Sequence, residues 1–230
     1  MQAAVGVDFE FAVQHYFTLL RDRALAAGAQ GNYAISAALV IRERGIEVVT
    51  VGANTVFGSR DPSGHAEMNT IRLAREVGAA EPGSAALSEC IREGSVIVRK
   101  APHSERESIL YTTLEPCPMC TVCIITAGIK RVVVAAEDPP SGSLVAERLR
   151  SLPPLWPELA NSLGLEVRLC QSSDASDPAT YLAPELHREL IDIFLASREP
   201  LDLVLGRDGA LDIRSIHAHA TASPQDQHTS

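Results

Sequence analysis

The chain has 230 residues, of which 46% are hydrophobic and 21% are charged. At about 150 residues per domain, this length fits one large domain or one domain with extensions, and the apolar content excludes a chain that is disordered throughout. Twenty Lys and Arg residues against 29 Asp and Glu residues give a net charge of −9, which disfavours a broad nucleic-acid-binding face because an acidic surface repels phosphates.

The first part of the chain predicts a helix, a hairpin and a second helix. Apolar residues recur at helical spacing over residues 8–27. Two strand-like runs follow, at 33–41 and 46–52, and the Arg-Glu-Arg-Gly segment between them is typical of a hairpin turn. After a loop rich in Gly, Pro and Asp, we expect a helix at about 65–77.

The segment from 78 to 108 is irregular. A break at 81–83 precedes a short helix over 84–92, a strand candidate SVIVR over 95–99 and a polar surface loop over 102–108.

From residue 109 the chain alternates between strands and helices. The strands are expected at 109–114, 131–137 and 165–169, with a helix from Pro116 to Gly128 and a mostly helical segment over 143–162. This β-α-β-α-β order implies parallel strands with right-handed crossovers, and the opening hairpin makes the sheet mixed. A last helix is expected at 184–197.

The cysteines indicate a reducing environment. Of five cysteines, three fall within seven residues, at 117, 120 and 123. An ordinary disulfide framework does not need that clustering, so we expect a cytoplasmic protein whose thiols are available to a metal. No stretch approaches the roughly 18 apolar residues that span a bilayer, and the opening MQAAVGVDFEFAVQ lacks the basic segment of a signal peptide. We therefore expect no membrane association.

Two short segments, HAE at 65–67 and PCPMC at 116–120, each open a predicted helix. Cys117 and Cys120 are three residues apart on a helix, so both sulfurs can reach one ion. His65 adds an imidazole, and Zn²⁺ binds both kinds of donor. Three protein ligands leave the fourth position to water, which is the catalytic rather than the structural arrangement. Cys123 is expected to be a core thiol, because a fourth sulfur would remove that open position.

Glu67 is the predicted catalytic residue. Zinc contributes +2, two thiolates contribute −2 and neutral His65 contributes nothing, so the site is near neutral and acidifies a bound water only weakly. A neighbouring carboxylate that accepts the water's proton makes hydroxide available near neutral pH. The alternative is an ordinary glutamate in the first turn of a helix, where it offsets the helix dipole.

These segments resemble the zinc-dependent cytidine deaminase superfamily, and most of all its branch of guanine deaminases, fungal-type cytosine deaminases and tRNA adenosine deaminases. The resemblance extends over roughly residues 8–170, and its specific parts are DPSGHAE at 61–67, LYTTLEPCPMC at 110–120 and VVVAAED at 132–138. It implies a zinc-dependent aminohydrolase acting on a cyclic amidine, with His65, Cys117 and Cys120 on the metal and Glu67 carrying protons.

The resemblance also implies substrate contacts. Asn54 lies eleven residues before His65, at the spacing of an asparagine that contacts the base or ribose in this branch. The alternative is a turn asparagine, a residue type that tolerates a positive φ. The backbone around Ala66 is expected to help position the ring. Guanine deaminases carry an acidic residue further along that reads the guanine edge, but a direct count lands on Arg148, with Glu137 and Asp138 in the same region.

The expected fold is of the α/β class: a three-layer α/β/α sandwich around a five-stranded mixed sheet whose last two strands are parallel. We expect a single deaminase domain over residues 1–200, with an insertion near 78–108. A C-terminal extension over 201–230 is expected to be largely disordered at its end.

The expected function is hydrolytic deamination of a small nucleobase or nucleoside, with a guanine-type purine favoured. Deamination of tRNA adenosine or of cytosine is an alternative, although the net charge disfavours nucleic acid. An inactive deaminase-like binding subunit is an alternative of another class, against which an intact Glu67 argues. A homodimer is expected, because this family usually pairs through its helices and because Ile124, Ile125 and Ala127 offer more apolar surface than one layer covers.

Overall fold

The computed structural model describes residues 7–81, 84–101, 106–139, 141–173, 177 and 180–204. Most of the expected C-terminal extension, and most of the expected loop over 102–108, lie outside the described residues. The elements are α1 (Val7–Ala29), β1 (Ser36–Glu43), β2 (Ile46–Ala53), α2 (Val56–Ser59), α3 (Ala66–Ala79), α4 (Ala85–Arg92), β3 (Val96–Lys100), β4 (Glu107–Leu114), α5 (Pro118–Thr126), β5 (Arg131–Ala136), η1 (Ala146–Ser151), α6 (Leu155–Leu163), β6 (Glu166–Leu169) and α7 (Pro184–Val204).

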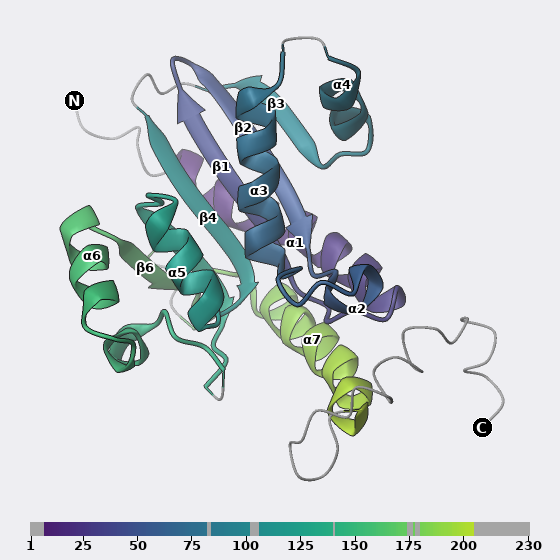
Figure 1. Cartoon of the computed structure of the whole chain (residues 1–230), viewed down its shortest axis with the longest axis vertical. Helices are drawn as coiled ribbons and strands as arrows, with labels where there is room; N and C mark the ends of the chain where they lie inside the picture. The colour runs from purple at the N-terminus through teal and green to yellow at the C-terminus, as the bar shows by residue number, and fades with distance from the viewer. Residues whose placement is uncertain are drawn as a thin grey trace, which may run out of the picture.

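The sheet has six strands in the order β3-β2-β1-β4-β5-β6 (Figure 1). Strands β1, β2, β3 and β4 pair antiparallel, whereas β4 with β5 and β5 with β6 pair parallel. The mixed sheet and its parallel end are as expected, but the count of five strands was wrong. The extra strand is β3, which belongs to the expected insertion and pairs with the outer edge of β2.

Helices cover both faces of the sheet, which confirms the three-layer architecture (Figure 1). One face packs against α1 and α7, with Tyr16, Phe17 and Leu20 of α1 beside Leu186 and Leu190 of α7. The other face packs against α3 and α5, and α6 packs beside α5. The central strands are buried on both sides because alternate residues face opposite layers.

The approach of α3 to the sheet is unusually close. A Cβ on Gly52 of β2 would clash with the hydroxyl of Thr70 and the backbone of Ala66. The Thr70 hydroxyl donates to the carbonyl of Ala37 in β1, at 3.0 Å. The start of α3, which carries His65 and Glu67, is therefore fixed against the end of the hairpin.

The predicted helices are largely confirmed, with some changes of extent. The segment over 143–162 divides into η1 and α6, as its prolines suggest. The last helix runs on to Val204, beyond the boundary expected for the domain. Among the helices in the described ranges, none combines the length and the apolar character that crossing a membrane requires.

A chain of ion pairs runs across the end of the sheet opposite to the amino end of α3. Glu47 is at its centre and is 3% exposed. It accepts from Arg42 Nε at 2.6 Å and from the Tyr16 hydroxyl at 2.8 Å. Arg42 also reaches Glu107, at 3.1 Å, and Glu107 pairs with Arg131, at 2.6 Å. Glu47 and Arg42 are both buried, so neither charge can be solvated by water and each depends on the other as a partner.

We expect Glu47→Ala to destabilise the fold by about 3–5 kcal/mol, because it leaves the buried Arg42 guanidinium without its closest carboxylate. Urea unfolding would measure the loss. Glu43→Ala is the matched control, since Glu43 pairs with the exposed Arg44 at 3.8 Å and should cost no more than about 1 kcal/mol. Equal costs for the two variants would contradict the role of the buried pair.

The stability lost in Glu47→Ala should depend on pH. Burial raises the pKa of Glu47, but hydrogen bonds from Arg42, Tyr16 and Arg99 outweigh it and hold the pKa below its usual range. The stabilisation is thus complete above the unfolded pKa of about 4.3 and is lost as the pH falls through the lower folded pKa. The difference between wild type and Glu47→Ala should therefore shrink in acid.

Candidate metal centre and substrate pocket

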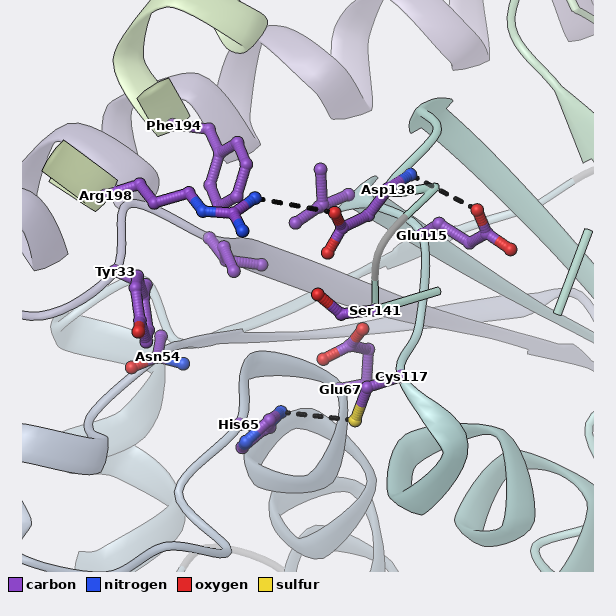
Figure 2. A pocket seen from close by; sticks show the side chains of 12 residues that line it. Tyr33, Asn54, His65, Glu67, Glu115, Cys117, Asp138, Ser141, Phe194 and Arg198 are labelled. Carbon is purple, nitrogen blue, oxygen red and sulfur yellow. Dashed lines mark hydrogen bonds and ion pairs between the residues drawn. The ribbon is translucent and has the colours of Figure 1, made fainter. Parts of the chain in front are cut away.

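A pocket lies at one end of the sheet, where β2, β4 and β5 end and β1 begins. Its cavity volume is about 240 Å³. The lining residues come from all three layers (Figure 2): Tyr33, Ile35, Asn54, His65, Glu67, Leu114, Glu115, Cys117, Asp138, Ser141, Phe194 and Arg198.

The metal donors stand at the starts of two helices. His65 is the N-cap residue of α3 and Cys117 is the N-cap residue of α5, both with extended backbones. Cys120 lies one turn into α5 and is fully buried. Because the positive ends of both helix dipoles point toward the donors, the thiolate form of a cysteine is stabilised there.

The donor atoms fit a zinc ion. The ligand atoms of His65, Cys117 and Cys120 all lie within 4.8 Å of one another, and Nδ1 of His65 is 3.6 Å from Sγ of Cys117. With Zn–S near 2.3 Å and Zn–N near 2.0–2.1 Å, the ligands of a tetrahedral site lie roughly 3.5–3.8 Å apart. One imidazole and two sulfurs are also the donor types that zinc prefers.

Hydrogen bonding within this cluster favours the thiolate form of Cys117. Hydrogen bonding from Cys120, together with His65, lowers the pKa of Cys117 to about 4, against the opposing effect of burial. The hydrogen bond with Cys117 in turn raises the pKa of His65, and it raises that of Cys120 together with burial. Among the described residues Cys123 is not part of the donor cluster, in keeping with its expected place as a core thiol.

Glu67 lies beside the donors in the floor of the pocket and is only 3% exposed. Its carboxylate is within 3.5 Å of Sγ of Cys120 and of the Thr112 hydroxyl. Burial raises the pKa of Glu67. A carboxyl group that is sheltered from bulk water yet faces a cavity is suited to taking up and returning a proton.

Asn54 and Ala66 occupy different positions. Asn54 lines the pocket and is buried, and its Oδ1 accepts from the backbone N–H of Val56 at 3.2 Å. Its Nδ2 is therefore the end that a ligand can use. Its φ is not positive, but the bond from the N–H two residues further on is the contact of an asparagine turn, so the turn role and a place in the pocket hold together. Ala66 is fully buried at the first position of α3, so only its backbone could serve a ligand.

Glu115 forms a buried anchor behind the pocket. Its side chain accepts from the backbone N–H groups of Asp138, Leu144 and Val145, at 2.9–3.2 Å. Arg148 binds the same carboxylate with two nitrogens, at 3.0 and 2.6 Å. Arg148 is thus committed to Glu115 and offers no counterpart to an acidic base-reading residue.

The wall opposite the metal donors was largely missed from the sequence. It contains Asp138, after β5, and Phe194 and Arg198 of α7, which Figure 2 shows across the cavity from His65 and Cys117. Nη1 of Arg198 lies 3.6 Å from Oδ1 of Asp138. The sequence indicates Asp138 only as one of two acidic residues in the region of the base-reading residue of guanine deaminases, and no local pattern marks Phe194 or Arg198.

Comparison with known proteins identifies the family. A model of the cytidine and deoxycytidylate deaminase zinc-binding region matches residues 12–136, which is more than half of the chain. The chain belongs to this family. Together with the donor cluster, membership makes it a zinc-dependent deaminase, in which His65, Cys117 and Cys120 are positioned as a possible zinc site.

Individual relatives within the deaminase family act on different substrates. The tRNA-specific adenosine deaminase of Agrobacterium fabrum is 30% identical over 56% of this chain and 69% of its own length. The guanine deaminase of Bacillus subtilis is 37% identical over 39% of this chain and 44% of its own length. A crystal structure of a mutant protein in complex with 8-azaguanine has a TM-score of 0.50 at 18% identity, covering 85% and 99% of the two chains, and it supports the fold alone.

We expect about one zinc per chain, and we expect Cys117→Ser to lose most of it, because one of three protein ligands is removed. Elemental analysis of the purified protein would measure the content. Cys123→Ser is the matched control, since Cys123 lies on the same helix outside the donor cluster. Full zinc in Cys117→Ser, or equal loss in both variants, would overturn the ligand assignment.

Proposed function

We propose that the protein hydrolytically deaminates a small nucleobase or nucleoside, with a guanine-type purine as the favoured substrate. The observation that carries the proposal is the placement of Glu67. A buried carboxyl group lies directly beside a His-Cys-Cys donor set, and both face one small cavity. A purely structural zinc site needs neither the cavity nor the carboxyl group.

The residues divide the chemistry between them. His65, Cys117 and Cys120 hold the zinc ion, which when bound supplies Lewis-acid activation of water as a nucleophile. Glu67 accepts a proton from the attacking water while the water oxygen adds to the amine-bearing carbon of the substrate. Glu67 returns the proton to the adjacent ring nitrogen and then assists proton transfer to the amine, so that the C–N bond breaks and ammonia leaves. Asn54 orients the ring through its amide.

The size and charge of the pocket support a small, neutral substrate. A cavity of about 240 Å³ is slightly smaller than the roughly 300–1,000 Å³ that is usual for a ligand site. The carboxyl groups of Glu67, Glu115 and Asp138 line it, and Arg198 is the basic side chain among its lining residues. An unattached base fits this environment better than a nucleotide with its phosphates.

Deamination of tRNA adenosine is the second candidate. The match to a tRNA-specific adenosine deaminase extends over 130 residues, against 90 for the guanine deaminase. The net charge of −9 opposes it, because binding to a polynucleotide depends on Lys and Arg contacts with phosphates. Cytosine remains a further alternative, and an inactive binding subunit is the alternative of another class.

An ammonia-release assay over free bases, nucleosides, nucleotides and tRNA separates these candidates. The proposal expects guanine or its nucleoside to be turned over fastest. Preferred turnover of tRNA or cytosine would replace the favoured substrate, and no release from any compound by the zinc-loaded protein would favour the binding subunit.

Cytoplasmic location is part of the proposal. All five cysteines are free, and a cluster of reduced thiols suits a reducing compartment.

A homodimer is also proposed, although the structure removes one of the reasons for it. Ile124 and Ile125 are buried within the single chain, so the expectation that they would be left uncovered was wrong. Exposed apolar side chains of α5 and α6, Met119, Leu155 and Leu159, provide a different surface. We expect light scattering at micromolar concentration to give a dimer mass, and Leu155→Glu to weaken the dimer. A monodisperse monomer of the wild type would contradict this.

We expect Glu67→Ala to keep the fold and the zinc but to lose deamination by several orders of magnitude. A group that transfers protons contributes roughly 10²–10⁴-fold for each step in which it acts. Activity on the best substrate and zinc content should be measured on the same sample. Glu76→Ala, on the exposed side of α3, is the matched control.

Wild-type turnover by Glu67→Ala would mean that Glu67 only stabilises the start of α3. Loss of the zinc from this variant would mean that Glu67 is a ligand rather than a proton carrier.

A further inference from the structure

One side chain of α3 holds both neighbours of Asn54. Nδ2 of Asn69 donates to the carbonyl of Ala53 at 2.9 Å and to Oγ1 of Thr55 at 3.0 Å. These two acceptors lie immediately before and after Asn54 in the chain. The segment that presents the Asn54 amide to the pocket is therefore tied to α3 on both sides.

The same asparagine also reaches the turn in front of His65. Nδ2 of Asn69 donates to the carbonyl of Gly64 at 3.3 Å, and the backbone N–H of Asn69 donates to the carbonyl of His65 at 2.9 Å. The N–H of Thr55 donates to the Gly64 carbonyl as well, at 2.8 Å. A Cβ on Gly64 would lie only 2.7 Å from Oγ1 of Thr55 and 3.0 Å from the carbonyl oxygen of Asp61, so the two segments are packed against each other.

The Asn69 amide does not itself face the substrate. An amide NH₂ has two hydrogens, and on Asn69 three acceptors share them. Its Oδ1 accepts from Nη1 of Arg72 at 3.3 Å, on the exposed side of the helix. Asn69 is also not among the residues that line the pocket, whereas Asn54 and His65 both are (Figure 2). Any effect of Asn69 on a ligand must act through these neighbours.

We propose that Asn69 is a positioning residue that fixes the Asn54 amide relative to the metal donor His65. The inference deepens the proposed function and rests on it for the ring that Asn54 contacts. Asn54 lies in a loop between β2 and α2, and a loop needs a rigid support if it is to hold a ligand precisely. Because one ring must meet the Asn54 amide and the metal site together, a change in their separation costs turnover, by roughly 100-fold for 1 Å.

Amide hydrogen exchange tests the positioning without a substrate. The N–H of Val56 donates to Oδ1 of Asn54, and the N–H of Thr55 donates to the Gly64 carbonyl, so their protection reports the side chain and the junction directly. In the zinc-loaded protein we expect Asn69→Ala to raise both exchange rates by at least about 10-fold. Asn69→Asp should do the same, because it keeps the side-chain shape but has no N–H to donate.

Turnover of guanine tests the consequence. We expect Asn69→Ala to lower kcat/KM by at least about 10-fold. The zinc content should stay unchanged, because the contact of Thr70 with β1 still holds the start of α3. Since Asn69 acts through Asn54, the double variant Asn54→Ala/Asn69→Ala should lose no more activity than Asn54→Ala alone.

Arg72→Met is the matched control. It removes the contact to Asn69 on the exposed side and leaves the three bonds from Nδ2 in place. Both the exchange rates and the turnover should keep their wild-type values in this variant.

The two measurements separate this inference from the proposed reaction. A wild type that does not deaminate guanine, but whose protection at Thr55 and Val56 is lost in Asn69→Ala, would refute the favoured substrate and support the positioning role. Unchanged protection in both Asn69 variants would overturn the inference whatever the activity. Losses that add in the double variant, or a less stable Asn69→Ala with wild-type kcat/KM, would also overturn it.

Discussion

The buried carboxylate of Glu115 joins the metal side of the pocket to its opposite wall. It lies two residues before Cys117, and its oxygens accept from backbone groups of the loop between Asp138 and Val145. Arg148 compensates its charge. Because a buried carboxylate without partners costs several kcal/mol, the loop is confined to the conformation that supplies these donors. The metal donor at the start of α5 and the carboxylate of Asp138 are thus positioned by one side chain.

The distribution of charge within the pocket differs from that of the molecule. The chain carries a net charge of −9, but two of the three carboxyl groups that line the pocket have a basic partner: Arg148 pairs with Glu115, and Arg198 pairs with Asp138. Two thiolates likewise offset the charge of a bound zinc ion. Because the paired charges in the pocket attract ions only weakly, the pocket discriminates among ligands by the direction of its hydrogen bonds and by the shape of the cavity.

That His65, Cys117, Cys120 and Glu67 lie together could be predicted because the information is local. HAE and PCPMC each open a helix, so short-range spacing is enough to bring three donors and Glu67 together. Phe194 and Arg198 could not be found in this way. Their position depends on how α7 packs against α1 and the sheet through Leu186 and Leu190, and no neighbouring residue marks them as part of a site.

The layers of the fold could likewise be predicted from alternating buried strands and amphipathic helices. The edge strands of the sheet, and the elements that cover a given apolar surface, could not be predicted. The strand over Val96–Lys100 was recognised as a candidate, but no sequence pattern shows that it extends the sheet beyond β2. In the same way, apolar residues such as Ile124 and Ile125 indicate that a surface is covered without indicating what covers it.

The position of β3 has a consequence for how the molecule behaves in a crowded solution. An unpaired sheet edge is a template for pairing with another chain, and an outer β2 would present eight residues rich in Val. With β3 added, the outermost strand is only five residues long and ends in Arg99 and Lys100. Short, positively charged edges resist strand-to-strand aggregation. The strand that the expected five-stranded sheet did not include therefore shields the β2 edge of the sheet against aggregation.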